Sequence, residues 1–135
     1  MEKIYEHPQG YCQMSFEESS RIFVLKLNGK IPLEDYKKIF EEGTHIFVSK
    51  NPQYMLADLT QLLSSDPLGR AWLVTHFMPT AARQIRNLKI AIAKPQNVFQ
   101  RFALVALLPA IEKFFSIKVF MADDYQTAYE WLRHH

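Results

Sequence analysis

Residues 88–93 read LKIAIA, a nearly continuous apolar run in which isoleucine recurs at alternate positions. Strands that are buried on both faces of a parallel sheet have this composition. Two more apolar runs occupy residues 54–59 and 117–122, and segments of helical periodicity lie between the three, at residues 68–84 and 98–115. This alternation predicts a parallel sheet whose strands are joined by crossover helices.

Two shorter strands are expected before this region. Residues 11–17 and 21–28 flank a polar turn and predict an antiparallel hairpin, whose second strand is closed by Gly29. A helix then begins near Pro32, because proline suits the first turn of a helix, and it ends at residues 51–52. The expected order is ββαβαβαβα, an α/β fold with a mixed sheet, parallel core strands and crossover helices.

The last helix of this order follows residue 122. Asp123 and Gln126 stand three residues apart, as in a capping box, so Asp123 is expected to cap the helix N-terminus. Ala128, Trp131 and Leu132 fall on one face of the same helix and are expected to pack it on the sheet.

The composition is that of one ordinary globular domain. The chain has 135 residues, 48% of them hydrophobic and 22% charged, and its single Cys12 cannot form an internal disulfide. We expect one domain over residues 1–135, with residues 1–10 as an N-terminal arm. The formal net charge of +2 is spread along the chain, which argues against nucleic-acid binding. Charges near the start and short apolar runs predict a cytoplasmic protein with no membrane span.

No metal, cofactor or catalytic site is expected. The five histidines show no metal-ligand spacing, and the four glycines form no phosphate-binding motif. Asp58, Asp66 and Lys94 fall near expected strand ends, but nothing in their pattern indicates a substrate. We therefore expect no enzymatic activity and no catalytic residue.

Three short patterns extend along most of the chain. They are LKLNG at residues 25–29, DLT at residues 58–60, and a closing series of VF, D, A and WL within residues 119–132. With the order of elements, they resemble the STAS superfamily, and most closely its SpoIIAA-like branch, from about residue 11 onward. The resemblance implies the STAS fold and a non-catalytic regulatory or interaction domain that docks a protein partner.

The resemblance does not extend to phosphorylation at the usual position. In the anti-sigma factor antagonists of that superfamily, the loop after this strand carries Asp-Ser-Ser/Thr-Gly, and its serine is phosphorylated. The matching residues 66–69 here read DPLG, so Pro67 stands where the phosphoacceptor would be. Asp66 and Gly69 match the pattern, and Ser64 and Ser65 remain available just before it.

The loops after parallel strands are where α/β sheets bind ligands and partners. The longest such loop is expected from residue 60 to residue 67, where Asp66 is placed to cap the next helix and Asp58 to bond loop amides. An unknown protein partner is expected to dock on this loop and the start of the helix, through a set of eight residues: Asp58, Thr60, Leu62, Leu63, Ser64, Ser65, Asp66 and Gly69.

An alternative function is the carriage or sensing of an apolar, lipid-like small molecule. Some relatives share features with lipid-binding STAS/SEC14-type proteins, so the resemblance leaves this alternative open. The expected pocket lies between helices and sheet and is lined by four aromatic residues, Trp72, Phe77, Phe99 and Phe102. Aromatic residues at helical spacing are also common in plain cores.

A homodimer is expected through the helical segment at residues 98–111. Residues 102–111 include no polar side chain, and a helix that is apolar on all sides must be covered on all sides. A twofold-related copy is the commonest cover, here on a stripe of four residues, Leu104, Val105, Leu108 and Ile111. The competing expectation is that the N-terminal arm folds over this helix with Ile4 and Tyr5.

Overall fold

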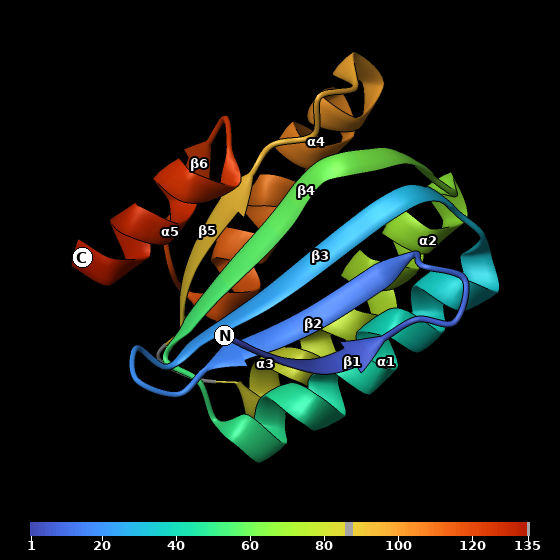
Figure 1. The fold of residues 1–135 in the computed structure, drawn as a ribbon. Coiled ribbons are helices and arrows are strands. Elements are labelled where there is room, and N and C mark those ends of the chain that lie inside the picture. Colours follow the sequence, from blue (N-terminus) through green and yellow to red (C-terminus); the bar gives the residue numbers. More distant parts are fainter. Residues whose placement is uncertain (86–87, 135) are drawn as a thin grey trace.

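Among residues 1–85 and 88–134, which the computed structural model describes, six strands form one sheet (Figure 1). The strands lie in chain order: β1 (Glu2–Glu6), β2 (Cys12–Glu17), β3 (Ile22–Ile31), β4 (Tyr54–Ser65), β5 (Lys89–Ala93) and β6 (Val119–Ala122). β1, β2 and β3 pair antiparallel, and β3 to β6 pair parallel. The expected α/β fold with a mixed sheet and parallel core strands is confirmed.

Helices cover both faces of this sheet (Figure 1). The helical elements are α1 (Leu33–Lys50), α2 (Pro67–Trp72), the π-helical turn η1 (Leu73–Phe77), α3 (Met78–Gln84), α4 (Val98–Phe115) and α5 (Tyr125–His134). Residues of α1, η1, α3 and α4 share the larger core with one face of the sheet, whereas α5 packs on the other face in a smaller core.

The alternation of side chains along the strands divides these two cores. In β5, Ile90 and Ile92 face the larger core, whereas Ala91 and Ala93 face α5. The short alanine side chains let α5 approach the sheet closely, and Leu132 of α5 is buried there. The apolar run at residues 88–93 therefore contributes side chains to the cores on both faces of the sheet.

The N-terminal arm is an edge strand. β1 pairs antiparallel with β2, and Ile4 and Tyr5 pack against the larger core. The order of elements therefore has one strand more than expected at its start. The expectation that the arm folds over α4 is wrong, because β1 lies at the edge of the sheet opposite β6.

Strands β3 and β4 both run further than the sequence indicates. Gly29 does not close β3, which continues to Ile31, and residues 60–65 are the second half of β4 rather than a loop. The two extensions pair with each other, with Gly29 opposite Leu62 and Ile31 opposite Ser65. Two register shifts interrupt this ladder, and Gly29 has φ of +76°, a conformation that glycine adopts easily.

A π-helical turn allows residues 67–84 to stay helical despite Pro79. Proline lacks an amide proton, and its ring clashes with the carbonyl four residues earlier in an α-helix. In η1 the amide of Met78 instead donates to the carbonyl of Leu73, five residues earlier. The wider turn ends at Phe77, two residues before Pro79, and Leu73, Phe77 and Met78 pack in the larger core.

The cap of α5 is one residue later than expected. The carboxylate of Asp124 accepts a hydrogen bond from the Thr127 amide at 2.8 Å, so the cap is Asp124 and not Asp123. Asp123 forms an ion pair with Lys94 at 2.9 Å instead. Two adjacent aspartates both suit a helix start, and the sequence alone does not distinguish them.

Candidate functional site

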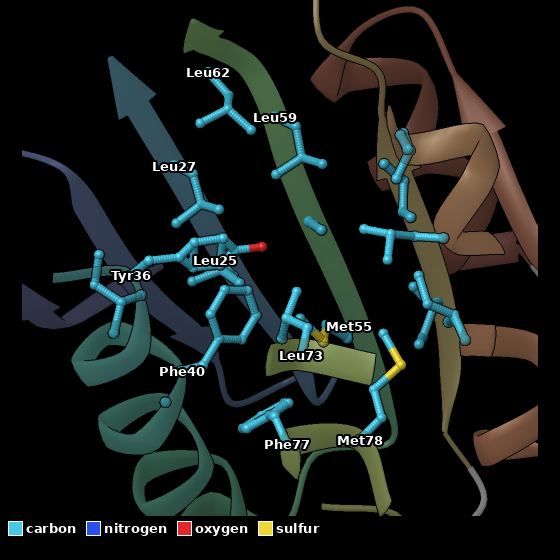
Figure 2. Close-up of a pocket in the computed structure, with 18 of the residues that line it drawn as sticks. Leu25, Leu27, Tyr36, Phe40, Met55, Leu59, Leu62, Leu73, Phe77 and Met78 are labelled. Atoms are coloured by element: carbon cyan, nitrogen blue, oxygen red, sulfur yellow. The ribbon is translucent and has the colours of Figure 1, made fainter. Parts of the chain in front are cut away.

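A cavity of about 170 Å³ lies between the sheet and the helices of its larger core. Its sheet side is formed by strand residues that include Leu25, Leu27, Met55, Ala57, Leu59 and Ile92. Its helical side is formed by residues that include Ile39, Phe40, Leu73, Phe77, Met78, Leu104 and Leu107. Figure 2 shows the labelled side chains of both sides converging on one space. The lining is almost entirely apolar.

The polar side chains of the lining come largely from one edge of the sheet. Tyr36, Arg70 and Gln100 lie in or next to the first turn of α1, α2 and α4, and each of these helices follows the carboxyl end of a parallel strand. Ser65 is the last residue of β4. Because these strand ends share one edge, the fold brings the four side chains to the same side of the cavity.

Arg70 and Tyr36 define the polar end of the cavity. The Arg70 guanidinium donates to the Ser65 carbonyl at 3.1 Å and to the Ser65 hydroxyl at 3.3 Å. Tyr36 is 6% exposed. Burial raises the pKa of its hydroxyl, and the nearby charge of Arg70 opposes that shift. Figure 2 shows the Tyr36 hydroxyl among the leucines of β3 and β4.

The Tyr36 hydroxyl is reachable from the cavity. Among the described residues, every side-chain nitrogen or oxygen that is fully buried has a hydrogen-bond partner. The Tyr36 hydroxyl has no partner among these residues, so it is not fully buried. Gly69 packs directly on the Tyr36 ring, since a Cβ there would stand 2.9 Å from Cδ1. The match of Gly69 to the family pattern therefore has a steric reason at this site.

The residues expected on the partner loop have different structural roles. Asp58 is buried in β4 and accepts from the Thr60 amide at 3.1 Å and the Thr60 hydroxyl at 2.7 Å. Asp66 caps α2 by accepting from the Leu68 amide at 2.8 Å, as predicted. Leu62 is buried and lines the cavity, whereas Leu63 is 52% exposed. Ser64 is half-buried.

One of the four aromatic residues expected in the pocket lines it. Phe77 belongs to the cavity wall, and Trp72 packs against the Phe77 ring at 5.6 Å without reaching the cavity. Phe99 and Phe102 are 79% and 71% exposed on the outer side of α4, so their expected place in the lining is wrong. The inner side of α4 contributes Leu104, which a count of aromatic residues misses.

The stripe expected to form a dimer interface is mostly turned inward. Leu104 is buried, and Leu108 and Ile111 are half-buried against the larger core, so of the four expected residues only Val105 is exposed. The exposed apolar residues of the helix form a different stripe, which we call the α4 stripe: Val98, Phe99, Phe102 and Val105. Their spacing places them on one side of the helix.

No catalytic set is assembled from the residues that fell near expected strand ends. Lys94 is paired with Asp123, while Asp58 and Asp66 bond local groups. Among the described residues, no three histidine, cysteine or carboxylate side chains gather closely enough to hold a metal ion. Every helix in residues 1–85 and 88–134 falls short of the length or the hydropathy that a membrane crossing requires.

Tyr36, Arg70 and Gln100 were absent from the sequence-predicted site. Each follows a parallel strand by only a few residues, and this placement was the signal that could have identified them. The polar residues before α2 form a stronger local pattern, so the expected site included the start of α2 and neither of the other two first turns.

Comparisons with known proteins place the chain in a family and support its fold. Residues 22–133 match the family described as SpoIIAA-like. An uncharacterized protein of the DUF3478 family from Shewanella loihica, with a SpoIIAA-like fold, is structurally similar at a TM-score of 0.60 and 18% identity. The similarity covers 90% of this chain and 91% of that one. A comparison with curated proteins found no match. By the match over residues 22–133, this chain belongs to the SpoIIAA-like family.

Proposed function

We propose that this domain acts by binding rather than by catalysis, and that it holds a small apolar molecule in the cavity under α1, η1, α3 and α4. The observation that carries this proposal is the apolar lining of a space of about 170 Å³. An apolar cavity of about 150 Å³ holds benzene, while drug-sized ligands need roughly 300 Å³ or more. The ligand is therefore small, and the apolar-ligand alternative becomes the leading one.

Thermal unfolding with 1-octanol tests the proposal. A ligand that binds only the folded state at one hundred times its Kd stabilises by about 2.7 kcal/mol, which raises Tm by roughly 10 °C in a domain of this size. The variant Ala57→Leu adds an isopropyl group to the cavity side of β4 and is expected to abolish the shift. Ala106→Leu, on an exposed site of α4, serves as the matched control and keeps it.

An equal absence of any shift in the wild type and both variants would contradict ligand binding. A shift that survives Ala57→Leu would place the 1-octanol elsewhere on the protein.

The exposed leucines beside the cavity support a second candidate function, regulation by docking a protein partner. Leu63 at the end of β4 and Leu68 in α2 are 52% and 65% exposed and lie on the segment singled out by the sequence. We expect Leu63→Asp with Leu68→Asp to abolish partner capture from lysate without unfolding the domain. Leu62 is unsuitable for this test because it is buried. Equal recovery of partners by the wild type and the double variant would show that Leu63 and Leu68 do not form the docking surface.

A cytoplasmic location is also part of the proposal. It rests on the single cysteine, Cys12, which is buried and free, because proteins that form no disulfide are typical of a reducing compartment. Fractionation of cells that express the tagged full chain tests it, and recovery in the periplasm or the medium would contradict it.

A further inference from the structure

The cavity has one polar end, and the charge there is positive. Arg70 is the one charged residue in the lining formed by the described residues. Its acceptors, the carbonyl and hydroxyl of Ser65, are neutral groups. No carboxylate of the described residues lies within ion-pair distance of it. Within residues 1–85 and 88–134, the guanidinium charge therefore has no counter-charge at the edge of this apolar space.

A second hydrogen-bond donor faces the same space. The Tyr36 hydroxyl is reachable from the cavity and has no partner among the described residues. Gly69, which packs on the Tyr36 ring, directly precedes Arg70, so the contact holds the start of α2 against the first turn of α1. A neutral tyrosine hydroxyl donates one hydrogen bond, and a guanidinium donates several in a planar fork.

These donors suit an anion with two coplanar oxygens. A carboxylate accepts from a guanidinium in a bidentate arrangement and can also accept from a neighbouring hydroxyl. The remainder of the ligand must be apolar, because nearly all of the other lining side chains are hydrocarbon. The volume limits that part to about the size of a benzene ring or a short alkyl chain.

We propose that the ligand is a small amphipathic carboxylate, with its apolar tail in the cavity and its carboxylate held by Arg70 and Tyr36. This inference rests on the proposed function and adds the chemical class of the ligand. Removal of the hydrocarbon tail from water favours binding. The two donors make the protein bind a carboxylate more tightly than a neutral molecule of the same chain length.

Calorimetric titration with octanoate and with 1-octanol tests the proposal, since the two probes share chain length and differ in the head. In Arg70→Gln we expect the octanoate affinity to fall at least tenfold and the 1-octanol affinity to stay within about twofold of the wild type. In Tyr36→Phe we expect a smaller loss of octanoate affinity, about threefold to tenfold. Arg83→Gln, on an exposed site of α3, is the matched control and changes neither affinity.

The outcomes separate this inference from the proposed function. If 1-octanol binds and the octanoate affinity is the same in wild type, Arg70→Gln and Tyr36→Phe, the carboxylate assignment is overturned and the apolar cavity stands. If neither probe binds the wild type, both are overturned. If Arg70→Gln does not fold, Arg70→Lys decides, because the lysine keeps the charge and loses the planar fork of donors. A lower octanoate affinity with an unchanged 1-octanol affinity supports the assignment, and an unchanged octanoate affinity overturns it.

Discussion

Glu17 connects the hairpin to the last helix through one set of hydrogen bonds. The Tyr129 hydroxyl of α5 lies 2.7 Å from both carboxylate oxygens of Glu17 at the end of β2, and the Ser20 hydroxyl also donates to it. The bond from Ser20, followed by that from Tyr129, lowers the pKa of the Glu17 carboxyl. The charged form of Glu17 is therefore favoured in the folded state.

Glu17→Gln is expected to destabilise the domain in a pH-dependent manner. Because the folded pKa of Glu17 is lowered, its stabilisation is present above the unfolded pKa and is lost as pH falls through the folded value. At neutral pH the wild type should unfold at a higher urea concentration than Glu17→Gln, and the gap should close below about pH 4. Glu18→Gln, at an exposed neighbouring site, is the control. If the difference in urea midpoint between wild type and Glu17→Gln is the same at neutral and acidic pH, the charge of Glu17 does not contribute to stability.

Cys12 should be chemically inert in the folded protein. The thiol is fully buried in β2, and burial raises its pKa to about 12, so almost no thiolate exists at neutral pH. A thiol-reactive dye is expected to label the unfolded chain in urea quickly and the native chain only at the rate of unfolding. Rapid stoichiometric labelling of the native protein would contradict the burial of this side chain.

Residue-level prediction from the sequence succeeded where a local hydrogen bond decides the conformation. Asp66 before Pro67 caps α2, as its position before a proline at the first helical turn indicates. The predicted cap of α5 was wrong by one residue. Asp123 and Asp124 both suit a helix cap, and only the path of the chain after β6 selects Asp124. The choice between them depends on tertiary contacts, which local patterns do not contain.

At the scale of elements, the sequence identified the helices and the strand cores but misplaced strand ends. The polar residues of 60–65 suggest a loop, yet this segment is paired with the equally polar end of β3. The pairing is non-local, since 28–31 and 61–65 are separated by the whole of α1. Each extension is stabilised by the other, so neither shows a strand signal by itself.

The α4 stripe should be covered in solution by a second copy of this chain. Phe99 and Phe102 are more than two-thirds exposed, and a single chain seldom presents neighbouring aromatic residues in this way. Light scattering after size exclusion is expected to give twice the 15.8 kDa of one chain. The pair Phe99→Lys and Phe102→Lys should give the mass of one chain while the domain stays folded.

The expected interface on Leu104 and Leu108 predicts a different result from the α4 stripe. Leu104→Lys is expected to unfold the domain, because Leu104 is buried against the cavity. A wild-type mass of one chain at micromolar concentration would reject the dimer on either stripe.

Helix α5 is held on the sheet by Leu132 more than by Trp131. Leu132 is 1% exposed, whereas Trp131 is half-buried and stacks on Phe120 of β6 at 4.7 Å. We expect Leu132→Ala to lower the free energy of unfolding by about 2 to 5 kcal/mol and Trp131→Ala to cost less than the roughly 3 kcal/mol of a buried tryptophan. Urea denaturation measures both. A larger loss of stability in Trp131→Ala than in Leu132→Ala would mean that α5 packs on the sheet mainly through Trp131.

At the scale of the whole molecule, the cavity could not be predicted from the sequence. Its lining comes from four strands, β2 to β5, and the helices that cover them, and each apolar residue taken alone is indistinguishable from ordinary core. The apolar side chains of Leu25, Ile39 and Leu73 are suited to a core, but nothing in the sequence shows that space remains between them. Only the packing of complete elements determines such a volume.

An isotope-filtered NOE experiment with 1-octanol on methyl-labelled protein tests whether the cavity binds an apolar molecule, because it identifies which side chains the octanol contacts. We expect cross-peaks from the octanol chain to the methyl groups of Leu25, Ile39 and Leu73, which line the cavity. We also expect these cross-peaks to disappear in Ala57→Leu. Cross-peaks confined to Val98 and Val105 on the α4 stripe, or none at a saturating concentration, would contradict the account.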